Sequence, residues 1–175
     1  MRYASIRKMD ISNGEGIGVS LFTQGCPIHC KGCFQPETWD FKGGMPLTGK
    51  EESIIYNALK PDYITRFSIL GGEPLVYDNL SQLNSILLTV RANFPDKKIW
   101  VWTGYTWDQL QEERKKYTPD KLMLTFQNID YLIAGPFIEE QKDLTLKWRG
   151  SKNQTVIDIQ QTLKENRVIY KKGDS

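Results

Sequence analysis

The chain has 175 residues, of which 39% are hydrophobic and 25% are charged, and its formal net charge is +2. This length and composition predict a single domain over residues 1–175 and exclude a disordered or fibrous chain. Lysine and arginine are interspersed with acidic residues, so no basic stripe indicates a nucleic-acid partner. No apolar run is long enough to span a membrane and no signal peptide is visible, so we expect a cytoplasmic protein without a membrane partner.

The predicted elements alternate between strands and helices. A strand over Ile17–Phe22 leads into a cysteine-rich segment. A helix then begins after Thr48, because Thr48 and Glu51 form the capping-box pattern, and Pro61 ends it. Ile64–Leu70 is a second, short apolar strand.

The second half of the chain continues this alternation. Asp78 is expected to cap a helix, whose apolar residues recur at helical spacing. These residues are Leu80, Leu83, Leu87 and Val90. Lys98–Trp102 is a third strand, and the following helix begins at a second capping box, Thr106–Gln109, and ends near Tyr117–Pro119. Ile129–Ala134 is a fourth strand.

Strands separated by helices require crossover connections, so the fold class is α/β with mostly parallel strands. A closed eight-stranded barrel needs about 250 residues, so this chain supports only a partial, open (β/α) barrel. The cysteine segment, Gly-Gly-Glu-Pro at 71–74 and Thr-Gly-Tyr at 103–105 each follow a predicted strand. Ligands bind at this carboxyl edge of parallel sheets, so one site is expected to contain all three segments.

The three cysteines of the chain, Cys26, Cys30 and Cys33, have the spacing C-x3-C-x2-C. An odd number at such close spacing is a poor disulfide framework, so a metal site is the better interpretation. An iron–sulfur cube held by three cysteines leaves one iron open to a small-molecule ligand. The alternatives are a structural zinc site with His29 as fourth ligand, or three unlinked cysteines.

The cysteine spacing after one strand, followed by Gly-Gly-Glu-Pro after the next, resembles the radical S-adenosylmethionine (SAM) superfamily. Other segments resemble the branch that activates the anaerobic (class III) ribonucleoside-triphosphate reductase. These segments are Phe22–Cys26, Gly32–Phe34, Glu37–Trp39, Asp130–Phe137 and Trp148–Gln154. The resemblance covers about residues 13–156 and implies the radical SAM type of partial barrel.

This resemblance implies a [4Fe–4S] cluster held by Cys26, Cys30 and Cys33, with SAM on the open iron. It also implies a low-potential electron donor, such as a flavodoxin, that reduces the cluster. SAM then breaks into methionine and a 5′-deoxyadenosyl radical, which abstracts a hydrogen atom from a glycine of the partner reductase. The cofactors supply this chemistry, so we predict no catalytic side chain beyond the cluster and SAM.

Several residues are predicted to bind SAM. Gly71 and Gly72 allow close approach to the backbone, and Glu73 offers a carboxylate to the amino group of SAM. Thr103 and Tyr105 place hydroxyl groups near the ribose or carboxylate of SAM. The alternatives for these two segments are an ordinary turn with a solvated glutamate and an ordinary helix entry.

Two further segments complete the predicted site. The superfamily commonly has an aromatic residue before the third cysteine, where this chain has Gly32. The reductase-activating branch instead has glycine there and an aromatic residue after the cysteine, as Phe34 is here, so the backbone of Gly32, Cys33 and Phe34 is predicted to contact adenine. The polar segment Arg149–Gln154 is interpreted either as a ligand or partner surface or as a solvated loop.

Three other functions compete with the activase hypothesis. The first is an activator of a different glycyl-radical enzyme, such as pyruvate formate-lyase. The second is a radical SAM enzyme for a small molecule, such as a carboxy-deazaguanine synthase. The third is a non-catalytic zinc-binding module, which metal content distinguishes from all the enzymes.

Overall fold

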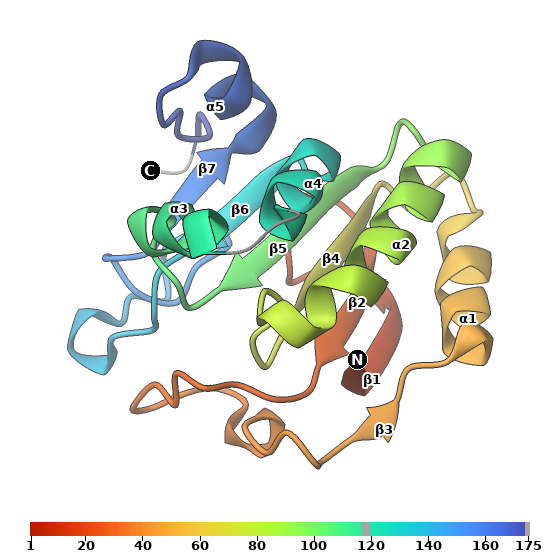
Figure 1. The fold of residues 1–175 in the computed structure, drawn as a ribbon, viewed down its shortest axis with the longest axis horizontal. Helices are drawn as coiled ribbons and strands as arrows, with labels where there is room; N and C mark the ends of the chain where they lie inside the picture. The colour runs from red at the N-terminus through yellow and green to blue at the C-terminus, as the bar shows by residue number, and fades with distance from the viewer. Residues whose placement is uncertain (117–119, 174–175) are drawn as a thin grey trace.

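The structure, a computed structural model, describes residues 1–116 and 120–173 as one open sheet with helices packed against it (Figure 1). The strands are β1 (Arg2–Asp10), β2 (Gly18–Thr23), β3 (Met45–Pro46), β4 (Arg66–Gly71), β5 (Lys98–Thr103), β6 (Tyr131–Ala134) and β7 (Thr155–Asp158). The α-helices are α1 (Gly49–Leu59), α2 (Tyr77–Asn93), α3 (Trp107–Lys116), α4 (Lys121–Asn128) and α5 (Ile159–Glu165). Short 3-10 helices lie at Pro36–Thr38 and Glu139–Gln141.

The seven strands of the described residues are arranged in the order β3-β1-β2-β4-β5-β6-β7. The central strands β2, β4, β5 and β6 are parallel, whereas β1 and β7 run antiparallel to their neighbours. The α/β class with mostly parallel strands is therefore confirmed. The sheet does not close, since β3 and β7 are its two edges. Its assignment to the radical SAM type of barrel stays a prediction.

Local sequence signals explain most helix starts. Both predicted capping boxes are present: Thr48 N–H donates to Glu51, and Thr106 N–H donates to Gln109 at 2.8 Å. The predicted cap at Asp78 is wrong, because α2 begins one residue earlier, at Tyr77, and its N-cap is Val76. The carboxylate of Asp78 instead lies in the first turn, where it suits the helix dipole. The predicted helix end near 117–119 lies outside the described residues.

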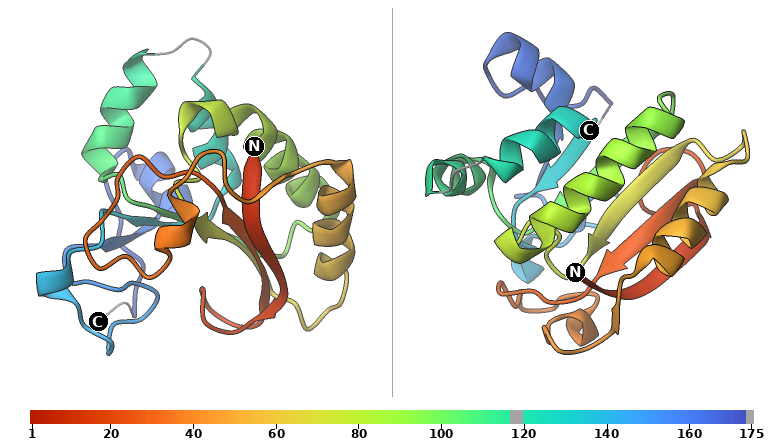
Figure 2. Two further views of the ribbon diagram at one scale, coloured as in Figure 1. Left: turned by 90° about the horizontal axis from the view of Figure 1, so that it is seen from below. Right: turned by 45° about the vertical axis from the view of Figure 1, so that its right-hand side comes forward.

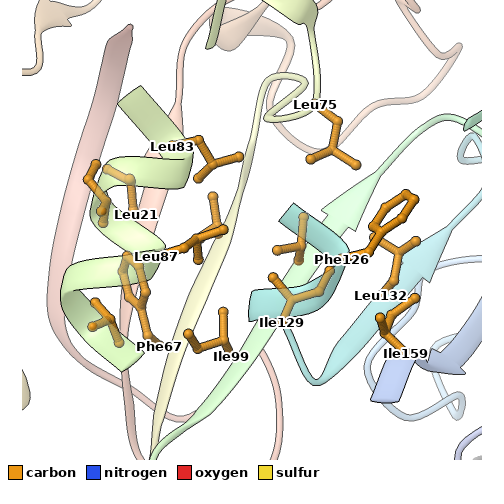
Figure 3. Packing of buried hydrophobic residues seen from close by; sticks show 14 of the residues in the cluster. Leu21, Phe67, Leu75, Leu83, Leu87, Ile99, Phe126, Ile129, Leu132 and Ile159 are labelled. Carbon is orange, nitrogen blue, oxygen red and sulfur yellow. The ribbon is translucent and has the colours of Figure 1, made fainter. Parts of the chain in front are cut away.

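The main hydrophobic core lies between the sheet and α1, α2 and α4, which cover one face (Figures 1 and 2). Leu21, Phe67 and Ile99 from the strands pack there with Leu87 and Phe126 from the helices (Figure 3). Because side chains alternate along a strand, the next residues point to the other face. A second, aromatic cluster forms there from Trp100, Ile133 and Val156 with Trp102, Tyr131 and Trp148.

No helix among the described residues is long and apolar enough to cross a membrane.

Candidate functional site

A cavity of about 630 Å³ lies at the carboxyl edge of the central strands, and Cys26, Cys30 and Cys33 all line it. The loop after β4, residues 71–73, lines the same cavity, as do Thr103 and Gly104 after β5. Because these strands are parallel, their carboxyl ends lie side by side, so segments distant in sequence surround one space. We call this space the cysteine-lined cavity.

All three cysteines are free thiols in a single loop, with Cys26 buried and Cys30 and Cys33 half-buried. Burial raises the pKa of the Cys26 and Cys30 thiols, while backbone N–H groups of Ile28 and His29 favour the Cys26 thiolate. The N–H of Gln35 donates to Cys33 Sγ at 3.4 Å. Such N–H donors stabilise thiolates and tune the potential of iron–sulfur clusters. The loop therefore presents three cysteine sulfurs as candidate cluster ligands, together with backbone N–H donors directed at Cys26 and Cys33.

These side chains do not form a site for a single ion. No group of three histidine, cysteine, aspartate or glutamate side chains in the described ranges converges to hold one metal ion. His29 stacks on Trp39 with ring centroids 4.6 Å apart, and it is not among the described residues that line the cysteine-lined cavity. This arrangement disfavours the Cys3His zinc alternative and fits a cluster, whose cysteine ligands bind different irons.

Glu73 is fully buried and joins two loops of the site. Its Oε1 accepts from Leu75 N–H at 3.0 Å and from the Thr103 hydroxyl at 2.8 Å, and its Oε2 accepts from Gly104 N–H at 2.7 Å. Desolvation raises the pKa of Glu73 to about 7, against the opposing effect of these donors. The solvated alternative for Glu73 is therefore wrong, whereas its role toward an amino group of SAM stays a prediction.

The glycine pair before Glu73 lies against the backbone that leads into the cysteines. Gly72 N–H donates to Thr23 O at 2.9 Å, and Glu73 N–H donates to Gly25 O at 2.8 Å. A Cβ atom at Gly72 would lie 2.4 Å from the carbonyl oxygen of Gly25, and Gly71 has a φ of 107°. The close approach that the sequence predicts for a ligand is thus also made by the cysteine loop itself.

The other predicted SAM-binding residues have different locations. Thr103 is buried, and its hydroxyl group donates a hydrogen bond to Glu73. Tyr105 does not line the cysteine-lined cavity among the described residues but a smaller pocket with Leu75 and Leu110. Gly32 lies beside the Glu139 side chain, outside the described cavity lining, whereas Phe34 lines the cavity and packs against Phe137 at 4.9 Å between ring centroids.

Residues 143–150 form a further wall, of which the sequence points only to the end, at Trp148–Gly150. Leu144, Leu146, Trp148 and Arg149 line the cavity from this segment. The polar segment Arg149–Gln154 is interpreted from the sequence as a ligand or partner surface or as a solvated loop, and Arg149, Gly150 and Gln154 of this segment line the cavity. Its later members also connect this turn to the residues after β6. Gln154 Nε2 donates to Gly135 O at 3.0 Å, and Asn153 Nδ2 donates to Pro136 O at 2.7 Å.

The loop between β1 and β2 also reaches the cavity through Ser12 and Asn13, which had no sequence signal. Buried Asp10 holds this loop, since its Oδ1 accepts from Ser12 N–H at 2.7 Å. Buried Arg66 of β4 donates in turn to Asp10 O at 2.7 Å and to the Ser68 hydroxyl at 2.6 Å. Arg66 also forms a buried ion pair with Asp10 at 3.4 Å, and this pair therefore fixes one rim of the cavity.

Comparison with known proteins agrees with this geometry. Residues 12–157, which include all three cysteines, match the family described as "4Fe-4S single cluster domain". The fold and the site thus define a protein of the single-cluster iron–sulfur class, and the cysteine loop fits such a cluster on its donor chemistry alone.

Similar individual proteins identify a narrower family within this iron–sulfur class. A protein of Haemophilus influenzae is 39% identical over 158 residues, covering 89% of this chain and 97% of the relative. Proteins of Vibrio cholerae and Escherichia coli are 38% and 37% identical with the same coverage. All three are named anaerobic ribonucleoside-triphosphate reductase-activating protein. The chain belongs to the family of these activating proteins.

Proposed function

We propose that this chain is a radical SAM activase, an oxidoreductase that generates a glycyl radical on an anaerobic ribonucleoside-triphosphate reductase. The observation that carries the proposal is the cysteine-lined cavity, which three cysteines of one loop share with the Gly71–Glu73 loop. Membership of the activating-protein family supports the reductase as partner. We infer that one radical SAM domain over residues 1–175 performs this activity in the cytoplasm.

The cysteines are the ligands of the cluster in this proposal. Cys26, Cys30 and Cys33 would hold a [4Fe–4S] cluster as thiolate ligands, leaving a site on the cluster for SAM. When bound, the reduced cluster supplies the electron that cleaves SAM. The N–H of Gln35, which donates to Cys33 Sγ, would orient this sulfur as a ligand.

The loops after β4 and β5 bind SAM. Glu73, supported by Thr103 and Gly104, fixes the two loops relative to each other, which holds the backbone at Gly71 and Gly72 in place for the amino acid part of SAM. The segment Gly32–Phe34 contacts adenine. The predicted contact between the Tyr105 hydroxyl and SAM is not part of this proposal, because the Tyr105 side chain lies in a different pocket.

The partners are two proteins. The reductase brings its glycine-bearing loop to the cavity, whose rim carries the exposed side chains of Phe34 and Leu144. A low-potential donor such as a flavodoxin supplies the electron. An exposed apolar rim on an open cavity suits a polypeptide substrate better than a small molecule.

Anaerobic reconstitution tests the proposal. The chain is loaded with iron and sulfide and reduced with dithionite in the presence of SAM, and 5′-deoxyadenosine is quantified. We expect about four irons and four sulfides per chain and production of 5′-deoxyadenosine, both of which Cys30→Ala strongly reduces because one iron loses its ligand. Stoichiometric zinc in place of iron, without SAM cleavage, would overturn the proposal in favour of a zinc-binding module.

The choice of glycyl-radical partner needs a separate test. An activator of a pyruvate formate-lyase type enzyme would cleave SAM equally well under these conditions. Mixing the reduced, SAM-bound chain with each candidate enzyme in turn distinguishes the two functions. Only the enzyme that the chain activates should acquire a glycyl radical.

A further inference from the structure

The ammonium group of Lys171, near the C-terminus, lies inside a cage of aromatic rings on the face of the sheet without the main helices. Its Nζ is 4.6 Å from the ring centroid of Trp148, 5.0 Å from that of Tyr131 and 5.8 Å from that of Trp100. It also forms an ion pair with Glu15 at 3.2 Å, and only 13% of its side chain is exposed. A desolvated cation over several rings is bound far more firmly than a surface lysine.

The backbone around Lys171 is fixed to the edge of the sheet. Lys171 N–H donates to Val156 O at 2.9 Å, and Asp158 N–H donates to Ile169 O at 2.8 Å. Tyr170 forms an antiparallel bridge with Ile157 of β7. The C-terminal segment is therefore held against the edge strand β7 by these backbone contacts, which place Lys171 at the cage.

The cage residue Trp148 is also a wall of the cysteine-lined cavity. It has a φ of 64°, a conformation that a bulky side chain adopts only when its surroundings hold it there. Its carbonyl accepts a hydrogen bond from Trp102 Nε1 at 2.8 Å, and its ring lies 5.2 Å from that of Trp100. Lys171 covers the same ring, so it helps to hold this turn and the adjacent Arg149.

The ion pair with Glu15 extends the effect to a second rim. Glu15 belongs to the loop between β1 and β2, whose residues Ser12 and Asn13 also line the cavity. One ammonium group thus connects the C-terminal segment, the Trp148 turn and the β1–β2 loop, and two of these three border the cavity.

We propose that Lys171 is a positioning residue for the cysteine-lined cavity, and that the C-terminal segment is part of the SAM-binding site through it. This inference rests on the proposed function, since SAM is the ligand whose binding depends on the wall. It does not make Lys171 a catalytic residue, because its side chain contacts aromatic rings and Glu15 and no reacting group.

Two measurements on matched variants test this role. Lys171→Met removes the charge at similar length, Lys171→Arg keeps it, and Lys172→Met removes the charge of the neighbouring exposed lysine. Hydrogen exchange of the metal-free chain should rise about tenfold at residues 143–150 in Lys171→Met and remain at the wild-type level in helix α1. Calorimetric titration of the cluster-loaded chain with SAM should give about tenfold weaker binding for Lys171→Met and wild-type affinity for the two controls.

The outcomes separate this inference from the proposed function. Unchanged exchange at 143–150, or unchanged SAM affinity in Lys171→Met, would overturn the positioning role while the activase proposal stands. A wild-type chain that carries its cluster but binds no SAM would overturn the proposed function, and the exchange data would then still decide whether Lys171 holds the turn. If Lys171→Met does not fold, Glu15→Gln weakens the ion pair between Lys171 and the β1–β2 loop, and it must raise exchange at residues 11–17 for the inference to hold.

Discussion

At the scale of single residues, Glu73 is the group whose environment departs most from that of a free side chain. It is a carboxyl group without solvent contact, and it joins the loops after β4 and β5. Desolvation raises its pKa from 4.5 to about 7, although three donors favour the charged form. Burial and these donors act in opposite directions, so Glu73 makes the folded state sensitive to pH.

The sign of this effect follows from the raised pKa. Below pH 4.5 the group is protonated in both the folded and the unfolded chain, so it makes no difference to stability. As pH rises to about 7, the unfolded chain loses the proton more readily, and the free energy of unfolding falls by roughly 3 kcal/mol. Urea unfolding of the metal-free chain between pH 4.5 and 8 measures this fall.

Glu73→Gln is the control for this prediction, because the amide does not titrate. Its free energy of unfolding should lack this component of the pH dependence, and it should be lower at acid pH because the amide leaves one of the three donors without an acceptor. If the variant and the wild-type chain have parallel pH profiles, Glu73 keeps an ordinary pKa and the account of its burial is wrong.

At the scale of elements, the contact between the loops after β2 and β4 limits which side chains fit in either loop. Gly72→Ala would bring a Cβ atom to 2.4 Å from Gly25 O, and Gly72 itself lies outside the left-handed region of φ. The substitution therefore introduces a backbone clash without backbone strain. We expect it to lower the free energy of unfolding of the metal-free chain by about 2 kcal/mol or more.

Gly49→Ala is the matched control for this clash. Gly49 is the first residue of α1, and a Cβ atom there would have no neighbour within 4 Å. Alanine favours the helix, so this substitution should leave the stability unchanged or raise it by up to about 1 kcal/mol. Urea unfolding of both variants decides the matter: equal stability for the two would contradict the predicted contact between the loops.

The elements also show which parts of the fold the sequence predicts. Apolar runs predict β5 to within one residue at each end and β4 to within two, and the capping boxes predict the starts of α1 and α3. Strand β1 was not predicted, because its residues after Tyr3 are mostly exposed or half-buried and do not form an apolar run. The short strand β7 depends on antiparallel pairing with β6, which is a tertiary contact that local sequence cannot specify.

The candidate site likewise has a part that the sequence predicts and a part that it does not. Parallel crossover strands explain why the cysteine loop meets Glu73 and Thr103, so this half of the site was predictable from strand ends. The wall at Asp143, Leu144 and Leu146 was not, and although the sequence pointed to Trp148 and Arg149, it could not predict the contacts of Trp148 with Lys171, Trp100 and Trp102. Such contacts between distant residues have no periodic signal in the chain.

At the scale of the whole molecule, the two faces of the sheet are covered by different parts of the chain. Helices α1, α2 and α4 cover one face of the sheet (Figure 2). The aromatic cluster lies on the other face, where Lys171 of the C-terminal segment contacts it. The sheet stays open because β3 and β7 do not pair. An open sheet leaves the carboxyl edge accessible, which is the geometry that an activating protein needs if its substrate is a loop of another protein.

The most direct test of this account combines the reduced, cluster-loaded chain with SAM and an anaerobic ribonucleoside-triphosphate reductase, and records the EPR spectrum of the reductase. We predict a glycyl radical signal that requires SAM and is absent with Cys30→Ala. SAM cleavage without any radical on the reductase, or a radical only on an enzyme of the pyruvate formate-lyase type, would contradict the proposed function.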